Sequence, residues 1–396
     1  MKLDEALLQV TDFLRAAGHT GELNWQPKNK VLEVEKATGV VHFVNIPRLI
    51  RGMPVEGDRA RRRYLERQLI ALREVPATVT PEWVLQRVVP RLTTRAAMES
   101  ARLRDSLWVA QEGGALHTVV SKTVSDELVV ALAFELSEDA IDITHEQLLR
   151  WGIDTEIAFT HAEKNLADAS HKPLHEMKKG LYVSADEDGH DATRMLVPAL
   201  FEKLQLNGEP VVFVPHPALM AVCGADDETA MLEAMGLAGR LAQQPRRLSP
   251  LAWQKSASGW SAHVPKTPRT QEALRQLQLA FAVEIYGEQG ALLDAMASAQ
   301  GQAANCAQVM AFEDSDGMPR SVTVWNEGQA PFLPKSEFIA LAVPQSPGSA
   351  QTRALVLKWD EVAALPGVKL TALNTVPVRF AATGFPNPRG LPGWHD

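Results

Sequence analysis

The first 75 residues alternate short apolar runs with turn residues in a helix, three-strand, helix order. Apolar residues recur at helical spacing in residues 4–17, which predicts an amphipathic helix that ends at Gly18. The residues expected near its buried face are Leu7, Leu8, Val10 and Leu14. Three strands are predicted next, and then a second helix, at residues 23–25, 31–34, 40–45 and 59–73. Residues 1–75 are therefore predicted to form a small α+β domain with a chaperone-like layout, an analogy of fold that carries no function.

The most strand-like run in the chain lies at residues 128–136 (LVVALAFEL), and we expect it to be central in a sheet. Thr144, followed three residues later by Gln147, fits a capping box at the start of a short helix. Asp154 or Thr155 is predicted to open the next helix. With a linker at residues 76–80, this pattern predicts a mixed α+β central domain over residues 80–264.

After a second proline-containing linker at residues 265–268, the pattern becomes helical and then β-rich. Residues 270–300 are predicted to form two helices with a break near Gly287-Glu288. Asp316-Gly317 lies between two apolar runs and predicts a hairpin. Further strands are expected at residues 338–343, 354–358 and 376–380, with a short helix starting at Trp359. The whole chain is thus predicted to be an α+β protein of three parts, the last covering residues 269–396.

The stretch from Gly189 to Asp227 contains most of the candidate chemistry. Asp191 is predicted to cap a helix that runs to about Leu204 and buries leucines at helical spacing. Arg194 falls at the edge of that buried stripe, so it needs a partner or must extend its head to solvent. Pro198 removes one backbone hydrogen bond and is expected to kink the helix.

The second half of this stretch predicts a hairpin followed by a helix. The apolar run at residues 211–214 is typical of a buried strand, and a second strand is expected at residues 218–222. His216 stands between two prolines at the tip. Asp226 or Asp227 is expected to cap the next helix, whose buried face would contain Met231, Ala234, Met235 and Ala238.

Two interpretations of the polar residues in this stretch remain open. In the first, they form one polar pocket built from His190, Asp191, Arg194, His216 and Asp226. In the second, the aspartates are helix caps, the arginine makes an ion pair at the rim, and the histidine is an exposed turn residue. Sequence spacing alone does not show that these side chains meet, and it favours the second interpretation.

Composition and charge narrow the class of protein. The 396 residues carry a formal net charge of −8, which argues against general nucleic-acid binding. The basic run at residues 59–63 (RARRR) lies on a predicted helix and is typical of a solvated face. There is no signal-peptide pattern and no apolar run of membrane length, so we expect a cytoplasmic protein that does not contact a membrane. High Ala and Arg usage suggests a bacterial source.

Templates for metal and cofactor chemistry are largely missing. The two cysteines, Cys223 and Cys306, are far apart and give neither a zinc pattern nor a disulfide framework. Pro173 disrupts helical pairing of His171 with His175, so no metal site is predicted. The sequence contains no phosphate-binding glycine loop and no nucleophile elbow, and we predict no cofactor.

Four segments, read together, resemble one family, the YtpQ-type bacterial proteins that carry a domain of unknown function. They are Val41–Pro47 (VHFVNIP), Ala162–Leu166 (AEKNL), Asp191–Leu196 (DATRML) and Val214–His216 (VPH). Their order and rough spacing agree with that family over residues 3–264. Pro198 departs from the regular helix of the family, and residues 265–396 extend beyond its shorter members. The family implies no assigned activity, so the resemblance draws attention to these residues and leaves the function open.

Three functional hypotheses follow. The leading one is a non-enzymatic adaptor that binds a protein partner through the first domain and the β-rich tail, because catalytic templates are missing. The competing one is an enzyme or a binder of a small anionic ligand, with Arg194 as the anion clamp and His216 as acid or base. Asp191 would orient one of them, and His190, Asn165 and Asp226 would add ligand contacts. Nucleic-acid binding through residues 59–67 is the third and is disfavoured by the acidic total.

Overall fold

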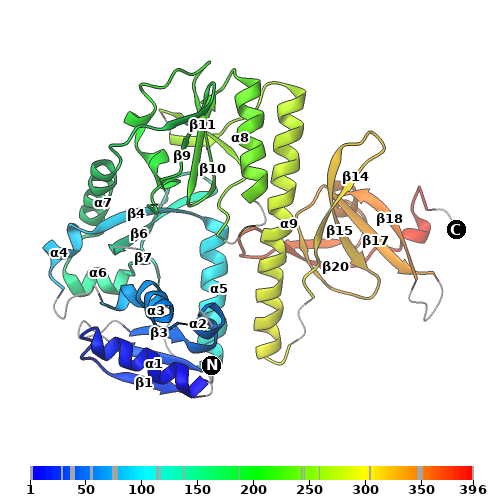
Figure 1. Cartoon of the computed structure of the whole chain (residues 1–396). Helices are drawn as coiled ribbons and strands as arrows, with labels where there is room; N and C mark the ends of the chain where they lie inside the picture. Colours follow the sequence, from blue (N-terminus) through cyan, green and yellow to red (C-terminus); the bar gives the residue numbers. More distant parts are fainter. Residues whose placement is uncertain are drawn as a thin grey trace.

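The computed structural model describes residues 3–394 except 28–29, 36–40, 54–56, 74–78, 113–115, 117, 137–138, 187, 242–243, 245, 258, 303–304 and 346–350. The chain is a mixed α+β protein, as predicted. Figure 1 shows an N-terminal lobe, a central lobe and a C-terminal lobe, with the long helix α9 between the last two. Within the described residues, no helix combines the length and apolar character needed to cross a bilayer.

The N-terminal lobe is the predicted arrangement of helices around a three-stranded meander. Its elements are α1 (Leu3–Ala16), β1 (Leu23–Gln26), β2 (Val31–Glu35), β3 (Val41–Asn45), α2 (Ile46–Gly52) and α3 (Asp58–Arg73). The buried residues of α1 are Ala6, Val10 and Leu14. Leu8, expected near this face, is 61% exposed. That part of the prediction was wrong because Leu8, two residues before the buried Val10, lies about 160° from it around the helix.

The first half of the central lobe is built on a sheet of order β4-β6-β5, with β7 paired to the end of β6. The elements are α4 (Pro81–Leu85), β4 (Val88–Thr94), α5 (Arg95–Glu112), β5 (Ser121–Thr123), β6 (Leu128–Leu136), β7 (Asp139–Asp142), α6 (His145–Trp151) and α7 (Thr155–Ala169). The predicted central strand is therefore confirmed. Thr144 forms a capping box with Gln147, and Asp154 caps α7, as the sequence predicted.

The second half of the central lobe is a six-stranded sheet of order β13-β12-β10-β11-β9-β8. Its elements are β8 (His175–Lys178), β9 (Leu181–Ser184), β10 (Pro210–His216), β11 (Leu219–Gly224), α8 (Glu228–Leu241), β12 (Ala252–Ser256) and β13 (Gly259–Ala262). The β10–β11 hairpin is confirmed. One apolar core joins the two central sheets, and α8 covers the other face of the six-stranded one. In this sheet β12 pairs antiparallel with both β10 and β13.

The predicted helix from Asp191 to Leu204 does not form. Two short 3₁₀ helices stand in its place, η1 (Thr193–Leu196) and η2 (Pro198–Leu200). Pro198 has no amide hydrogen and its ring excludes a continuous α-helix through this point. Asp191 is accordingly not an N-cap, and its fully buried carboxylate is used elsewhere.

Helix α9 (Pro268–Ala299) is continuous for 32 residues, so the predicted break at Gly287-Glu288 was wrong. Isolated glycines cost a helix only about 1 kcal/mol each, which tertiary contacts can offset. Such contacts flank the expected break: Tyr286 and Gln289 donate hydrogen bonds to the carbonyls of Val378 and Pro377. Glu288 forms ion pairs with Arg104 of α5 and with Arg247.

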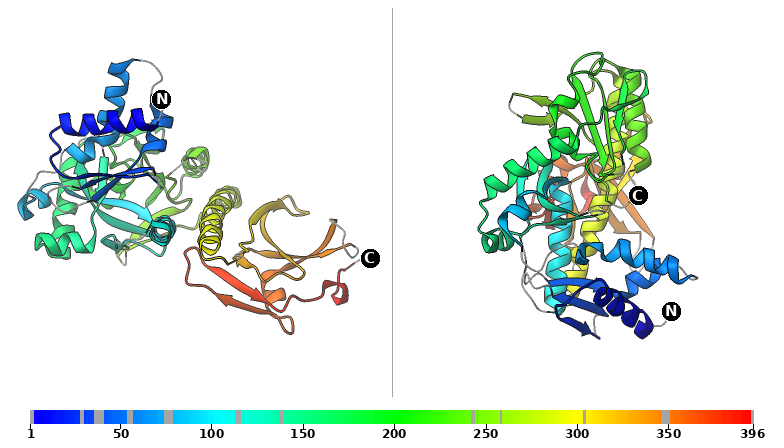
Figure 2. Two further views of the ribbon diagram at one scale, coloured as in Figure 1. Left: turned by 90° about the horizontal axis from the view of Figure 1, so that it is seen from below. Right: turned by 60° about the vertical axis from the view of Figure 1, so that its left-hand side comes forward.

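The C-terminal lobe contains two small sheets, of order β14-β15-β17-β18 and β16-β20-β19. Its elements are β14 (Val309–Glu313), β15 (Pro319–Asn326), β16 (Phe332–Pro334), β17 (Phe338–Pro344), β18 (Thr352–Lys358), α10 (Trp359–Ala363), β19 (Lys369–Ala372), β20 (Arg379–Thr383) and the 3₁₀ helix η3 (Pro388–Gly390). The hairpin around Gly317 and the helix at Trp359 are confirmed. Two views show this lobe joined to the rest of the chain along α9 (Figure 2).

Candidate functional site

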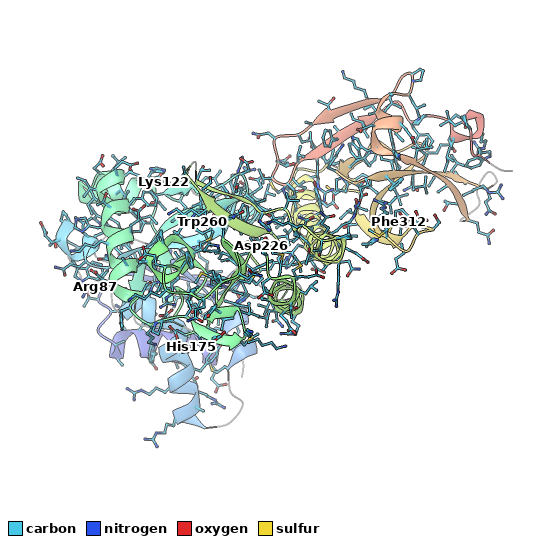
Figure 3. All side chains as sticks on the ribbon, turned by 90° about the horizontal axis from the view of Figure 1, so that it is seen from above. Arg87, Lys122, His175, Asp226, Trp260 and Phe312 are labelled. Carbon is cyan, nitrogen blue, oxygen red and sulfur yellow. The ribbon has the colours of Figure 1, made fainter. Side chains whose placement is uncertain are left out.

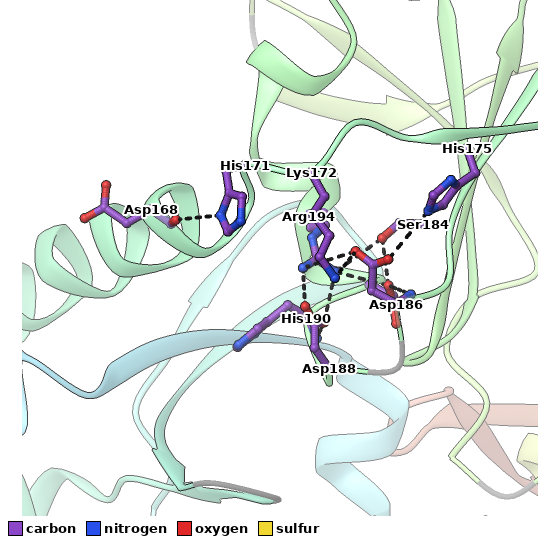
Figure 4. A network of polar contacts seen from close by, with 10 residues as sticks. Asp168, His171, Lys172, His175, Ser184, Asp186, Asp188, His190 and Arg194 are labelled. Atoms are coloured by element: carbon purple, nitrogen blue, oxygen red, sulfur yellow. Dashed lines mark hydrogen bonds and ion pairs between the residues drawn. The ribbon is translucent and has the colours of Figure 1, made fainter.

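The buried side chain of Arg194, in η1, lies at the centre of an ion network with aspartates of the loop between β9 and η1. Its side chain is 2% exposed. Nη1 donates hydrogen bonds to Asp188 Oδ1 at 2.9 Å and to Asp191 Oδ1 at 3.1 Å, and Nη2 pairs with Asp188. Asp186 lies 3.9 Å from Nη2. Figure 4 shows Asp186 and Asp188 beside the guanidinium of Arg194.

The carboxylate of Asp191 fixes the backbone of this loop. It accepts hydrogen bonds from the Ser184 hydroxyl at 2.7 Å and from the Asp186 amide at 2.8 Å. Burial alone would raise the pKa of the Asp188 carboxyl, but the hydrogen bond and charge of Arg194 lower it below its usual range. Burial opposes the charge on Arg194, yet the pairing with Asp188 raises its pKa. The pairing thus favours the charged forms of both Asp188 and Arg194.

This geometry favours a structural role for Arg194 over an anion clamp. A guanidinium binds an anion through its N–H donors, and here both terminal nitrogens are engaged by carboxylates. An incoming anion would have to displace these carboxylates and would meet their like charge. The loop aspartates Asp186 and Asp188 were not among the predicted site residues, although their place just before the Asp191–Arg194 segment was a signal for them.

The two predicted histidines are placed beside this network. His190 is 6% exposed and adjoins Asp188, whose carboxylate accepts its backbone amide hydrogen. His216 lies at the tip of the β10–β11 hairpin, where its Nδ1 accepts a hydrogen bond from the Ala218 amide. The Ala192 amide donates to the Pro217 carbonyl at 3.1 Å, which brings that tip to the loop.

Asn165 and Asp226 are involved in other contacts. Asn165 donates from its amide to the carbonyls of Leu85 and Val88, and so ties α7 to the turn between α4 and β4. Asp226 forms an ion pair with Lys266 at the start of the segment that leads into α9. Figure 3 shows Asp226 on the central lobe, apart from His175. The single pocket of the first interpretation therefore lacks Asp226, and the amide of Asn165, a ligand contact in the competing hypothesis, is used in the fold.

The histidines that invite a metal assignment line the outside of the network. His175 Nε2 lies 3.7 Å from Asp186 Oδ1, and Lys172 Nζ lies 3.8 Å from Asp186 Oδ2. His171 contacts the carbonyl of Asp168. Among the residues that the structure describes, no group of three or more His, Cys, Asp or Glu side chains is placed to hold a metal ion.

A second buried arginine, Arg379, was missed by sequence reasoning. It is 0% exposed and donates to Gln289 Oε1 and to three backbone carbonyls, those of Tyr286, Ala307 and Phe332. Burial lowers its pKa. Gly290 leaves room for it, because a Cβ there would lie 2.9 Å from Nη2. Arg379 of β20 therefore connects α9 to β16 and to the segment before β14. It is a structural centre of the C-terminal lobe.

An open groove of about 620 Å³ lies between α9 and the C-terminal lobe. One wall is the face of α9 that begins at Pro268 and ends at Ala282, and the other includes Met318, Ser321, Lys335 and Glu337. The α9 wall carries two amides, two charged side chains and two small or aliphatic ones beyond Pro268: Gln271, Gln278, Glu272, Arg275, Leu279 and Ala282. No local pattern in the sequence predicts this groove, because residues about 60 positions apart meet across it.

An ion network organises the middle of the groove. Glu337 pairs with Arg275 of α9 and with Arg320 of β15, and Arg320 also pairs with Asp314. Arg275 in addition donates to the Pro319 carbonyl at 3.0 Å. Partial burial opposes ionisation of Glu337, but its pairing with Arg275 lowers its pKa below the usual range. The groove is therefore preorganised and its central charges are mutually satisfied.

Comparison of the chain with protein families, with curated proteins and with solved structures gives no match.

Proposed function

We propose that this chain is a non-enzymatic adaptor that binds an extended segment of a partner protein in the groove between α9 and the C-terminal lobe. The observation that carries the proposal is the groove itself. It has a volume of about 620 Å³, and a single face of α9 lines one side of it from end to end. The proposal keeps the role expected for the β-rich tail and now names a surface for it.

The dimensions of the groove suit a peptide. Its α9 wall extends from Pro268 to Ala282, a separation of fourteen positions and about 21 Å at the rise of an α-helix. An extended peptide advances about 3.3 Å per residue, so about six residues fit along this wall.

The lining has the mixed character of a protein interface. Gln271 and Gln278 carry amides that can bond to a peptide backbone, whereas Leu279, Ala282 and Met318 offer apolar surface. Ser321, the hydroxyl residue of the lining, accepts a hydrogen bond from the Glu337 amide. This contact gives the hydroxyl a structural use and supports binding over nucleophilic catalysis. The resemblance to the YtpQ-type family remains a proposal and, because it covers residues 3–264, does not bear on the groove.

A random octapeptide display library, selected on the full chain, tests this function. Ala282→Trp fills the groove, and Ala280→Trp places the same side chain on an exposed position of the same helix. Selected peptides should bind the wild type and Ala280→Trp, and should lose at least about tenfold in affinity for Ala282→Trp. Thermal melts of both variants control for folding. Peptides that bind Ala282→Trp as well as the wild type, or no selected peptide at all, would refute the proposal.

A further inference from the structure

The two ends of the groove carry opposite charge. Glu272 lies near the beginning of the α9 wall, where its carboxylate accepts a hydrogen bond from the Gln276 amide. Among the described residues, no ion pair joins Glu272 to a cation. A negative charge that is half-buried and unmatched favours a basic group on whatever occupies this end.

Lys335 supplies the positive charge at the other end. Its backbone amide contacts the Tyr286 hydroxyl at 3.3 Å, fourteen residues along α9 from Glu272. Its ammonium lies 4.3 Å from the centre of the Trp359 ring and 4.0 Å from Asp360, whose side chain is 97% exposed. Because the Asp360 carboxylate is exposed and at the edge of ion-pair distance, it neutralises little of the Lys335 charge. Burial accordingly lowers the pKa of Lys335 more than Asp360 raises it.

The charged residues in the middle of the groove add no net charge between its two ends. Arg275 and Arg320 share Glu337, and Arg320 has Asp314 as a second partner. Two cations and two carboxylates therefore balance between the ends. The electrostatic pattern along the groove is negative, neutral and positive.

We infer that the bound segment is an extended peptide with a carboxylate side chain opposite Lys335 and a basic side chain opposite Glu272, about five residues apart. This inference rests on the proposed function and adds the chemistry and the direction of its ligand. Glu272 lies ten residues, or about 15 Å, from Ala282 at the other end of the α9 wall, and about five residues of an extended peptide cover this distance. For a peptide of given sequence the two charges fix its direction in the groove, because the reverse orientation would place like charges together at both ends.

The same octapeptide library, selected in low salt, tests the polarity. Peptides selected on the wild type should carry an acidic residue (Asp or Glu) and a basic residue (Lys or Arg) about five positions apart. Exchange of the acidic residue for its amide should lower the affinity about threefold to tenfold. Lys335→Glu should reverse the preference at that position, and Lys335→Gln should abolish it. Lys369→Glu, an exposed change on β19, is the control and should leave the preference unaltered.

The outcomes separate the two proposals. If peptides are blocked by Ala282→Trp but show no charge pattern, or if Lys335→Glu keeps the wild-type preference, the groove binds peptides and the inferred polarity is wrong. If no peptide is blocked by Ala282→Trp, both proposals fail.

Discussion

The replacement Arg379→Met tests whether one buried guanidinium holds the C-terminal lobe together. Methionine fills a similar apolar volume but donates no hydrogen bond. It would remove the bonds to Gln289 Oε1 at 2.7 Å, to the Ala307 and Phe332 carbonyls at 2.8 and 3.0 Å, and to the Tyr286 carbonyl at 2.6 Å. Because Arg379 is 0% exposed, water cannot readily replace these donors.

The magnitude follows from two opposing terms. Four hydrogen bonds from a charged donor contribute roughly 1.5–3 kcal/mol each, or about 6–12 kcal/mol together. Removing a buried charge recovers a desolvation cost of several kcal/mol. The free energy of unfolding of the C-terminal lobe should therefore fall by about 2–5 kcal/mol.

Denaturant unfolding followed by tryptophan fluorescence measures this loss, since Trp325 and Trp359 are buried in the same lobe. Arg389→Met is the matched control. Arg389 is 44% exposed, contacts Glu327 and the Pro344 carbonyl, and should cost less than about 1 kcal/mol. The reasoning is refuted if Arg379→Met costs no more than Arg389→Met.

Three further predictions follow from the packing. The pKa of Asp188 is lowered by its arginine partner against the effect of burial, so its contribution is fully present above about pH 3.8 and is lost as the pH falls through the folded-state pKa. Asp188→Asn should cost about 1–3 kcal/mol at neutral pH and flatten the acid limb of a plot of melting temperature against pH. Burial raises the pKa of Glu127, with a smaller opposing effect of its hydroxyl partner, so its ionisation destabilises the fold as the pH rises past about 4.5. Glu127→Gln should therefore raise stability at neutral pH by about 1 kcal/mol, and an unchanged or lower melting temperature would contradict this. Gly290→Ala should destabilise by about 1–2 kcal/mol because its Cβ meets the pinned Arg379, whereas Gly287→Ala on the same helix should stabilise by up to about 1 kcal/mol. Equal effects of the two alanines in chemical denaturation would count against that steric account.

Local signals in the sequence were sufficient where neighbouring residues determine the structure. The capping box at Thr144 and the cap at Asp154 use hydrogen bonds between residues two or three apart. The hairpin at Gly317 needs a backbone with positive φ, which glycine adopts without strain. The central position of β6 follows from its unbroken apolar run.

The sequence could not predict features that depend on distant partners. Arg379 bonds to residues 47 to 93 positions away, so no spacing along the chain marks it. In α9, Glu288 at the predicted break pairs with Arg104 and Arg247 of the central lobe, which lie far from it in the sequence. For Arg194 the sequence left open a partner or a head extended to solvent; the side chain has partners, and the main one, Asp188, was not among the predicted site residues.

The anchoring of α9 gives the groove its physical basis as a binding surface. Leu274, Leu277 and Phe281 face the central lobe and pack against the core of α8. Gln271, Gln278 and Ala282 of the same helix line the groove on the other side. A wall held by a buried core and by the Glu288 ion pairs loses little conformational entropy when a peptide binds. The arrangement therefore favours recognition by a preformed surface, in which affinity depends on the match between the peptide and the charges fixed along α9 and beside it.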